Sequence, residues 1–374
     1  MRIGLDGRYG LLRTRRGIGV YVYQLLRMWA TEKPQGFEFV VFVDSRADPS
    51  IMAELARPYL AIKMLRANPF AVWEQIAWPI AARQSRCDAL HGTANIAPLI
   101  WRGPFVLTLH DVIEWHRARD FPSTLTVRHQ LSRAYRMGTV AANVKRATGI
   151  ITVSEHARRD IASTLYPDRR DHPPIAVIPL GGDSPKAPVD PSILERYHLT
   201  PNGYAMAFGA ADPRKNVGLL LSIWTSPRRP RIPLVLVGFE PKELRRLSRR
   251  YGHHPSITLL GFEPDERVRA LMRHSTVFLY PSFYEGFGLP VIEALAAGVP
   301  VLVSKGTAAE EIADGAAWAL DPYNPEEWSL AVDSLAANVQ VRRDTQLKGR
   351  NIADQYTWER TAMNTIQAYR KFLG

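Results

Sequence analysis

The sequence predicts an α/β protein with two doubly wound domains, each built on a parallel β-sheet. Short apolar runs rich in β-branched and aromatic residues alternate with segments of helical period. The alternation begins at residue 2 and begins again at residue 204, after a polar stretch with four prolines. A chain of 374 residues also exceeds what one hydrophobic core usually encloses. We therefore expect domains at 1–183 and 203–355, a linker at 184–202 and a terminal helix at 356–374.

The first half begins with a buried strand at 2–6, a polar loop and a helix near residue 18. Gly17 and Gly19 lie where this loop meets the helix, and they are either turn residues or part of a ligand-binding loop. His91 lies at the end of one expected strand, and His110 directly follows another. Open α/β sheets bind ligands at the carboxyl ends of their strands, so both histidines are candidates for a site. The expected strands lie at 37–43, 88–90, 105–109, 149–153 and 175–178.

The segment 122–146 is a long helix candidate with arginines along its length. Two interpretations stay open, because a basic helix either presents a solvated face or docks on anionic lipid. The next helix, which ends near residue 165, has Ser154 in a position to cap its first turn.

The second half places cations at the end of its first strand, at 204–209. Gly209 ends that strand, and Arg214 and Lys215 follow in the loop before the next helix. A planar guanidinium and a mobile ammonium both suit a pyrophosphate, although exposed cations are common on protein surfaces. Two further strands end in Gly238 and Gly261, where the backbone can approach a flat ligand. Helices are expected at 265–272, 325–338 and 341–354.

The stretch 276–303 reads as a strand, a loop, a helix and another strand. Pro290 suits the start of the helix and Gly298 the residue just past its end. The backbone N–H groups of Gly286, Phe287, Gly288 and Leu289 open onto the helix N-terminus, which favours an anion. Glu285 and Glu293 can accept hydrogen bonds from hydroxyls, or they can merely complement the helix dipole. Donors for phosphate beside acceptors for hydroxyls indicate a sugar nucleotide site.

The composition limits the kinds of ligand and partner that this protein can bind. The single cysteine, Cys87, excludes an intrachain disulfide and a zinc site of the cysteine type. With no signal peptide at residues 1–4, we expect a reducing, cytoplasmic location. No apolar run is long enough to span a bilayer. A net charge of +12 favours an anionic partner, namely a phosphorylated substrate, an anionic membrane surface or nucleic acid. Nucleic acid ranks last because no nucleic-acid-binding motif accompanies the charge.

Several of these motifs together resemble glycosyltransferase family 4, whose members are retaining enzymes with the GT-B fold. The resemblance covers nearly the whole chain. The motifs are Ile-Gly-Leu-Asp-Gly-Arg at 3–8, Gly-Ile-Gly at 17–19, His-Asp-Val-Ile at 110–113, Val-Ser-Glu at 153–155, Pro-Arg-Lys-Asn at 213–216, the two glutamates, and Trp-Glu-Arg at 358–360. The resemblance implies two Rossmann-like domains that face across a cleft, with the acceptor held by the first, the donor by the second, and the terminal helix crossing back to the first.

The family pattern implies a role for each matching residue. Glu285 would contact hydroxyls of the donor sugar, and Glu293 the nucleotide ribose. Arg214 and Lys215 would bind the pyrophosphate, and His110 would orient the sugar. The loop with Gly17 and Gly19 would face the phosphates. One departure is Ala210, where many relatives have a cation or a serine, so one phosphate contact is in doubt.

The resemblance is strongest to a branch rich in mannosyltransferases. It implies transfer of a mannosyl group from GDP-mannose to a polyprenyl-diphosphate-linked glycan, in O-antigen or exopolysaccharide assembly at the inner face of the cell membrane. No cofactor and no divalent metal are expected, because the cations are built in and no Asp-x-Asp triplet is present. The alternatives are another donor (UDP-glucose, UDP-N-acetylglucosamine or a deoxysugar nucleotide) or a non-catalytic scaffold at a membrane.

Overall fold

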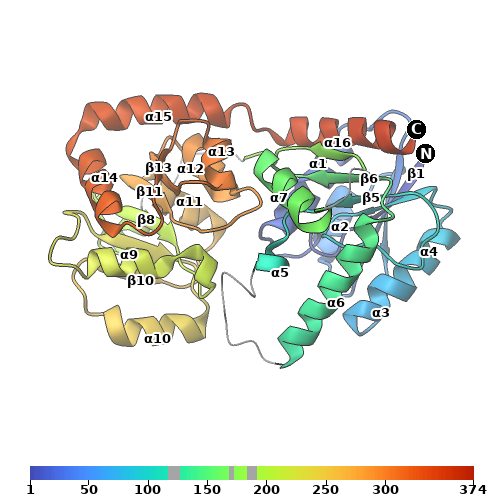
Figure 1. Cartoon of the computed structure of the whole chain (residues 1–374), viewed down its shortest axis with the longest axis horizontal. Helices are drawn as coiled ribbons and strands as arrows, with labels where there is room; N and C mark the ends of the chain where they lie inside the picture. The colour runs from blue at the N-terminus through green and yellow to red at the C-terminus, as the bar shows by residue number, and fades with distance from the viewer. Residues whose placement is uncertain (117–126, 168–171, 183–191) are drawn as a thin grey trace. The chain divides into compact units, whose positions relative to one another are not determined.

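A computed structural model describes residues 1–116, 127–167, 172–182 and 192–374 of the chain (Figure 1). The chain divides into two compact units. The first consists of Met1–Gly181 together with Trp358–Gly374, and the second is Gly182–Thr357. The C-terminal segment therefore packs with the first unit, and the second unit is one continuous stretch of chain.

The described part of the first unit has a seven-stranded, all-parallel sheet in the order β3-β2-β1-β4-β5-β6-β7. Residues in its central strands are almost all buried, because helices cover both faces and each strand reads as a continuous apolar run. The strands are β1 (Arg2–Asp6), β2 (Glu38–Val43), β3 (Leu60–Met64), β4 (Ala89–Gly92), β5 (Phe105–Thr108), β6 (Gly149–Thr152) and β7 (Ile175–Val177).

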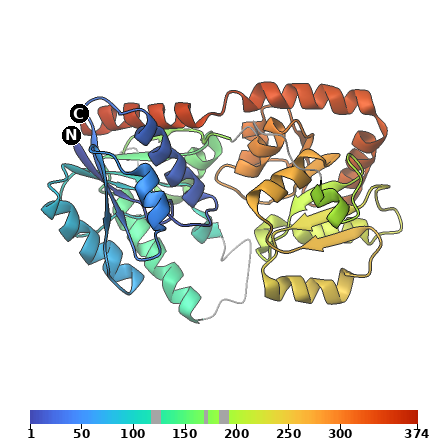
Figure 2. The same ribbon diagram turned by 180° about the vertical axis from the view of Figure 1, so that it is seen from behind.

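Two helices from opposite ends of the chain pack together on one face of this sheet (Figure 2). Trp29 of α1 stacks on Phe39 at 4.5 Å between ring centroids and lies 6.0 Å from the ring of Tyr369 in α16. Trp73, Trp78, Val140 and Val144 fill the core on the other face. The helices are α1 (Ile18–Thr31), α2 (Pro49–Leu55), α3 (Phe70–Val72), η1 (Trp73–Ala77), α4 (Trp78–Gln84), α5 (Ile113–His116), α6 (Val127–Val144), α7 (Glu155–Leu165) and α16 (Trp358–Leu373).

The second unit has a six-stranded parallel sheet in the order β10-β9-β8-β11-β12-β13 among its described residues. The strands are β8 (Ala205–Phe208), β9 (Leu234–Val237), β10 (Ile257–Leu260), β11 (Val277–Tyr280), β12 (Val301–Ser304) and β13 (Trp318–Leu320). The helices are α8 (Ser192–Arg196), η2 (Pro213–Lys215), α9 (Val217–Trp224), α10 (Pro241–Tyr251), α11 (Asp265–Arg273), α12 (Leu289–Ala296), α13 (Ala308–Ala313), α14 (Pro325–Ala337) and α15 (Val339–Ala353).

The predicted fold class is confirmed, and two parallel sheets lie where the strand pattern placed them. In the described part of the expected linker at 184–202, residues 192–196 form the helix α8, with Ile193 and Leu194 buried. The remainder of that stretch and the start of the basic segment 122–146 lie outside the described residues. Local patterns also missed β3, α2 and the helical segment 70–84. Within the described residues, no helix is both long and apolar enough to cross a membrane.

Candidate active site

Strand order brings two loops of the second unit together. The chain runs from β8 to β9 and β10 on one side, then returns to β11 on the other side of β8. This reversal is the topological switch point, where an open α/β sheet leaves a crevice at the carboxyl ends of its strands. The loop after β8 carries Arg214 and Lys215, and the loop after β11 carries Glu285. These three predicted site residues therefore lie beside one another.

A four-residue charged cluster joins the two loops. Lys215 Nζ donates to Glu285 Oε1 at 2.5 Å, and Arg214 Nη1 donates to Glu285 Oε2 at 3.2 Å. Arg214 Nε also donates to Asp212 Oδ2 at 2.9 Å. Two cations and two carboxylates therefore balance one another. Glu285 is 8% exposed, so these ion pairs are partly shielded from water.

Backbone contacts set the shape of the first loop. The carboxylate of Asp212 accepts from the N–H of Arg214, so it caps the short helix η2. Asn216 ends η2 in the left-handed conformation, with φ of 52°, which asparagine tolerates better than most residues. The N–H of Phe283 donates to the carbonyl oxygen of Arg214 at 2.8 Å. The two loops are therefore tied through the backbone as well as through charge.

Burial and the charges of the cluster shift the pKa values of Glu285 and of the neighbouring Tyr280. Burial alone would raise the pKa of Glu285, but Lys215 and Arg214 outweigh it and hold that pKa below the usual value. Burial and the nearby Glu285 carboxylate raise the pKa of Tyr280 well above 10, so its hydroxyl stays protonated. Lys215 Nζ lies 3.3 Å from this hydroxyl. At neutral pH the cluster therefore contains an ionised Glu285 carboxylate next to the neutral phenol of Tyr280.

The second loop ends at the N-terminus of α12. Gly288 has φ of 115°, a backbone conformation that is unfavourable for residues with a Cβ atom, and Leu289 begins the helix. Phe287 anchors the loop, because its buried ring packs against the ring of Tyr356, with 5.9 Å between the ring centroids. Glu293 lies one turn into the helix and is half-buried. Gly298 follows the helix with φ of 70°, as the sequence predicted.

The remaining predicted glycines of this unit end neighbouring strands. The N–H of Gly209 donates to the carbonyl oxygen of Val237 at 2.8 Å, and the N–H of Gly238 donates to the carbonyl oxygen of Gly261 at 2.9 Å. A Cβ atom on Gly209 would lie 2.4 Å from the ring of Phe239, so a side chain there would clash. The strand ends are therefore closely packed beside the charged cluster.

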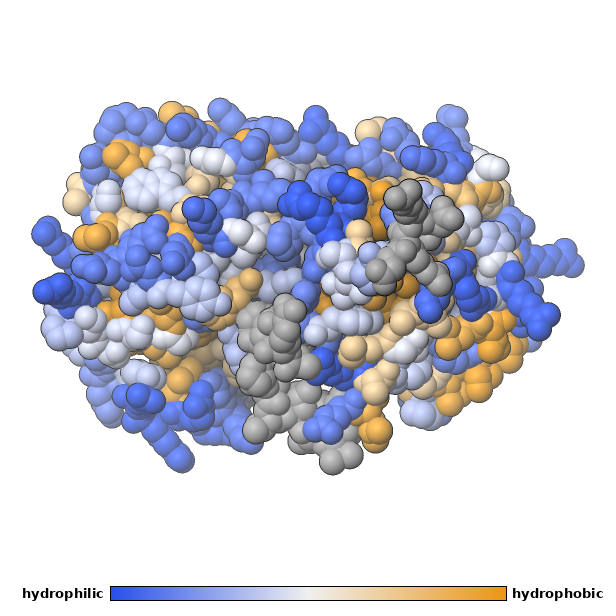
Figure 3. All heavy atoms as spheres, viewed as in Figure 1, coloured by the Kyte–Doolittle hydropathy of each residue, from blue (hydrophilic) through white to orange (hydrophobic). Residues whose placement is uncertain are grey.

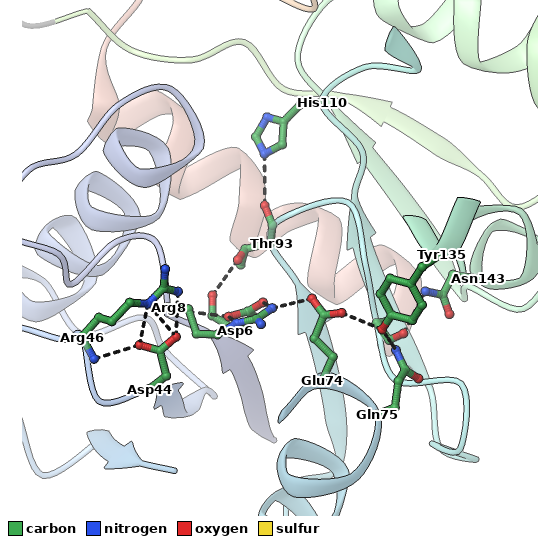
Figure 4. Close-up of polar contacts among 11 residues, drawn as sticks. Asp6, Arg8, Asp44, Arg46, Glu74, Gln75, Thr93, His110, Tyr135 and Asn143 are labelled. Atoms are coloured by element: carbon green, nitrogen blue, oxygen red, sulfur yellow. Dashed lines mark hydrogen bonds and ion pairs between the residues drawn. The ribbon is translucent and has the colours of Figure 1, made fainter. Parts of the chain in front are cut away.

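In the first unit, the loop after β4 holds His110 in place (Figure 4). The N–H of His110 donates to Asn95 Oδ1 at 2.9 Å, and its ring Nε2 lies 3.0 Å from the carbonyl oxygen of Thr93. A carbonyl can only accept, so Nε2 carries the proton and Nδ1 is left as an acceptor. Tyr21 packs edge-on against the ring at 5.0 Å. Burial lowers the pKa of His110 to about 4, so the ring is neutral at pH 7.

His91 is a buried connector. Its ring nitrogens lie 2.6 Å from the hydroxyl of Tyr369 in α16 and 2.7 Å from that of Thr108. Burial lowers its pKa to about 3. Thr108 in turn contacts the hydroxyl of Tyr21 at 3.0 Å. His91 therefore links the C-terminal helix to the side chain that supports His110.

A buried ion cluster lies on the other side of Thr93 (Figure 4). The hydroxyl of Thr93 donates to the backbone oxygen of Asp6 at 2.6 Å. Arg8 pairs with Asp6 at 2.6 Å and with Glu74 at 2.7 Å, and all three side chains are fully buried. The guanidinium also lies 4.0 Å from the ring of Trp73. This cluster braces the end of β1, next to the switch point of the first sheet.

The other two predicted residues of this unit lie at the start of α1. Gly17 is exposed, has φ of 45° and precedes the first helical residue. Gly19 is buried, and a Cβ atom there would lie 2.7 Å from the carbonyl oxygen of Tyr9. Gly19 therefore lets the helix pack against the loop after β1.

Sequence reasoning missed the residues that hold these sites in place. They are Asp212, Tyr280, Thr93, Asn95, Arg8 and Glu74. Most of them become partners of a predicted residue only through strand order or helix packing. Asp212 alone carried a local signal, because an aspartate before Pro-Arg-Lys is a typical capping residue. Among the described residues, no group of three or more His, Cys, Asp or Glu side chains is placed to hold a metal ion.

Comparison with known proteins identifies the class to which this architecture belongs. The structure resembles that of sucrose-phosphate synthase from Thermosynechococcus elongatus, with a TM-score of 0.77 at 18% identity, over 100% of this chain and 99% of that one. This likeness identifies the GT-B fold. A model described as "Glycosyltransferase Family 4" matches residues 15–184, and one described as "Glycosyl transferases group 1" matches residues 200–352. The chain belongs to glycosyltransferase family 4.

Curated relatives cover part of the chain. The O-antigen chain mannosyltransferase B of Escherichia coli is 35% identical over 232 residues, which is 59% of this chain and 60% of that protein. The serotype-specific mannosyltransferase WbdA of Escherichia coli is 26% identical over 190 residues, 49% of this chain and 23% of that protein. The matches thus span less than two thirds of these relatives.

Proposed function

We propose that this protein is a glycosyltransferase that binds the pyrophosphate of a nucleotide sugar at Arg214 and Lys215. The observation that carries this proposal is the charged cluster at the switch point of the second sheet. Two partly buried cations share the carboxylate of Glu285 beside the N-terminus of a helix, so built-in positive charge faces the ligand crevice.

The cluster suits a leaving diphosphate. When a glycosyl bond to a nucleotide breaks, negative charge grows on the departing phosphate oxygens. Arg214, Lys215 and the N–H groups from Gly286 to Leu289 would stabilise that charge, because preorganised donors act most strongly in a crevice of low dielectric. Hydrogen bonds to charged groups contribute roughly 1.5–3 kcal/mol each, so a few donors lower the barrier substantially.

We further propose that transfer retains the anomeric configuration. The acceptor hydroxyl would attack from the face that the nucleotide leaves, and a phosphate oxygen of the leaving group would accept its proton. Glu285 would hold the sugar hydroxyls and Glu293 the ribose. Nδ1 of His110 would accept a hydrogen bond from a further hydroxyl of the sugar. Divalent metal would not be needed, because Arg214 and Lys215 supply the positive charge.

GDP-mannose is the donor that we propose. Support comes from two curated relatives that carry the name mannosyltransferase, one of them 35% identical in the matched region. The acceptor would be a lipid-linked glycan of O-antigen or exopolysaccharide assembly, and the enzyme would act as a peripheral protein on the cytoplasmic face of the membrane. A UDP sugar or a deoxysugar nucleotide is the alternative donor, since no residue discussed above reads the base.

A donor panel tests this proposal. Purified protein is incubated with GDP-mannose, UDP-glucose and UDP-N-acetylglucosamine, and thermal stabilisation, released nucleotide and product mass are measured, with and without EDTA. We expect GDP-mannose to stabilise the protein most, and activity to persist in EDTA. Stabilisation by a UDP sugar alone would reject the mannosyl assignment.

A pair of lysine variants tests the binding site itself. We expect Lys215→Ala to weaken nucleotide binding about tenfold or more, because it removes a charge-assisted bond to phosphate. Lys348→Ala is the matched control, because Lys348 is exposed on α15 and forms no salt bridge to a carboxylate among the described residues. Equal nucleotide affinity in the two variants would reject the proposed phosphate site.

A further inference from the structure

An exposed apolar surface lies on the first unit, on the outer side of the helical segment whose Trp73 and Glu74 face inward. It consists of Ile76 and Ile80, which lie one turn apart in the helical segment 70–84, and of Leu99 and Ile100 in the turn after β4. Their exposed fractions are 50%, 43%, 38% and 48%. Figure 3 shows hydrophobic side chains gathered over the region where Figure 1 places α3 and α4. We call these four residues the isoleucine face.

Two hydrogen bonds hold the helix and the turn side by side. The N–H of Leu99 donates to Gln75 Oε1 at 2.7 Å, and Arg83 Nη2 donates to the carbonyl oxygen of Ile100 at 3.1 Å. Trp73 and Trp78 of the same helical segment are buried in the core, so the segment is firmly packed. The isoleucine face is therefore a fixed feature of the fold and not the result of a loose segment.

Four cations lie on or next to the elements that carry this face. Arg146 Nη1 donates to the carbonyl oxygen of Leu99 at 2.7 Å, which places a second guanidinium beside that of Arg83. Arg102 and Lys145 are exposed and adjacent in sequence to these elements. Across the described residues, none of these four cations forms a salt bridge to a carboxylate. Apolar side chains and uncompensated positive charge thus occupy one surface.

We propose that the isoleucine face and its cations dock the protein on an anionic lipid bilayer. Apolar side chains can enter the boundary between headgroups and acyl chains, while arginine and lysine bind lipid phosphates. A contiguous apolar patch with a polar rim marks an interaction site. A second copy of this chain fits less well, because a two-fold contact through this face would bring the same cations together. The proposal rests on the proposed function in one respect: docking on the bilayer would give the enzyme access to a lipid-linked acceptor.

Vesicle binding tests the proposal without donor or acceptor. The full chain is sedimented with vesicles of phosphatidylcholine alone and with vesicles of equal parts phosphatidylglycerol and phosphatidylcholine. We expect binding to the anionic vesicles only. The double variant Ile76→Ser/Ile80→Ser should bind about tenfold more weakly or worse, because apolar area is lost. The affinity of Arg102→Gln/Lys145→Gln for anionic vesicles should fall roughly 25-fold, because each cation near an anionic surface contributes about fivefold.

Matched control variants separate this face from general effects of charge and hydrophobicity. Leu330→Ser/Leu347→Ser removes apolar residues of the second unit that are 65% and 62% exposed. Arg245→Gln/Arg249→Gln removes two exposed cations of α10. We expect both controls to bind anionic vesicles within about twofold of the unaltered protein. Melting temperatures of all four variants should be unchanged, since the altered side chains are exposed.

Three outcomes would overturn the proposal. One is no binding of the unaltered protein to anionic vesicles, and another is an equal loss of binding in the control variants. The third is a dimer in solution that Ile76→Ser/Ile80→Ser converts to a monomer. Transfer to a water-soluble acceptor should be the same in the face variants and the unaltered protein. Failure of vesicle binding with transfer intact would therefore leave the proposed enzyme function standing, and the reverse result would leave the docking surface standing.

Discussion

Replacing Glu285 by glutamine tests the charge balance of the cluster. Glutamine keeps the size of the side chain but removes the negative charge that Arg214 and Lys215 share. Both cations are then left in a crevice where their side chains are only 21% and 24% exposed. The variant should therefore be less stable than the unaltered protein when no ligand is bound, and more dependent on an anionic ligand.

The magnitude follows from the contacts. Breaking a fully buried ion pair costs about 3–5 kcal/mol, and a surface pair contributes about 0–1 kcal/mol. Because about a quarter of each cation stays in water and Arg214 keeps its bond to Asp212, we expect a loss of about 2 kcal/mol. In a unit of this size, that corresponds to a fall in melting temperature of roughly 4–8 °C. Transfer should fall about a hundredfold or more.

The assay is thermal unfolding with and without GDP. A bound diphosphate supplies the missing negative charge, so GDP should raise the melting temperature of Glu285→Gln by more than that of the unaltered protein. The control is Glu243→Gln. Glu243 also pairs with an arginine, Arg246, through two bonds of 2.6 and 2.9 Å, but Arg246 is 71% exposed. This control should lose at most about 0.5 kcal/mol.

Two results would refute the reasoning. Equal melting temperatures for Glu285→Gln and Glu243→Gln would mean that the loop cluster is no stronger than a surface pair. A smaller effect of GDP on Glu285→Gln than on the unaltered protein would mean that the two cations do not face the diphosphate.

Other predictions concern the first unit and pH. Asn95→Ala removes the acceptor for the backbone N–H of His110, so the loop should loosen and water should reach the buried ring. Because burial is what lowers the pKa of His110 to about 4, that pKa should rise toward its usual value in an NMR titration, and transfer should slow about tenfold; an unchanged pKa would count against this role of Asn95. Tyr369→Phe should cost about 1–2 kcal/mol in unfolding, because it leaves a buried nitrogen of His91 unpaired, and an unaltered melting temperature would contradict this. Acid should destabilise the first unit. The unfolded chain binds protons at His91 and His110 below about pH 6.5 while the folded chain does not, so stability should fall by up to about 1.4 kcal/mol per histidine for each pH unit down to about pH 4. Likewise, the stabilising charge of Glu285, whose pKa is lowered, should be present above pH 4.5 and lost as pH falls below it, so Glu285→Gln should be less acid-sensitive than the unaltered protein.

Local sequence patterns predicted the fold class because each strand buried on both faces is a continuous apolar run. The central strands are recognisable from their own residues, and so are capped helices such as the one after Ser154, whose hydroxyl accepts from the N–H of Ala157 at 3.0 Å. The segment 70–84 was missed because its apolar residues follow no regular helical period. Its middle is a wider π-helical turn, and Trp73 and Trp78 both face the core. Packing of the tryptophans against distant strands, more than local preference, accounts for this shape.

Local sequence was sufficient to place Arg214, Lys215, Glu285 and the strand-ending glycines of the second unit in the loops that follow apolar runs. Chain direction alone puts such loops at the carboxyl edge of a parallel sheet. Which of these residues meet depends on the order of the strands in the folded sheet. Arg214 and Glu285 are 71 positions apart, and they pair because β11 lies beside β8. The same holds for Arg8 with Glu74 and for His91 with Tyr369, since hydrogen bonds and ion pairs act over a few ångströms in space, whatever the separation along the chain.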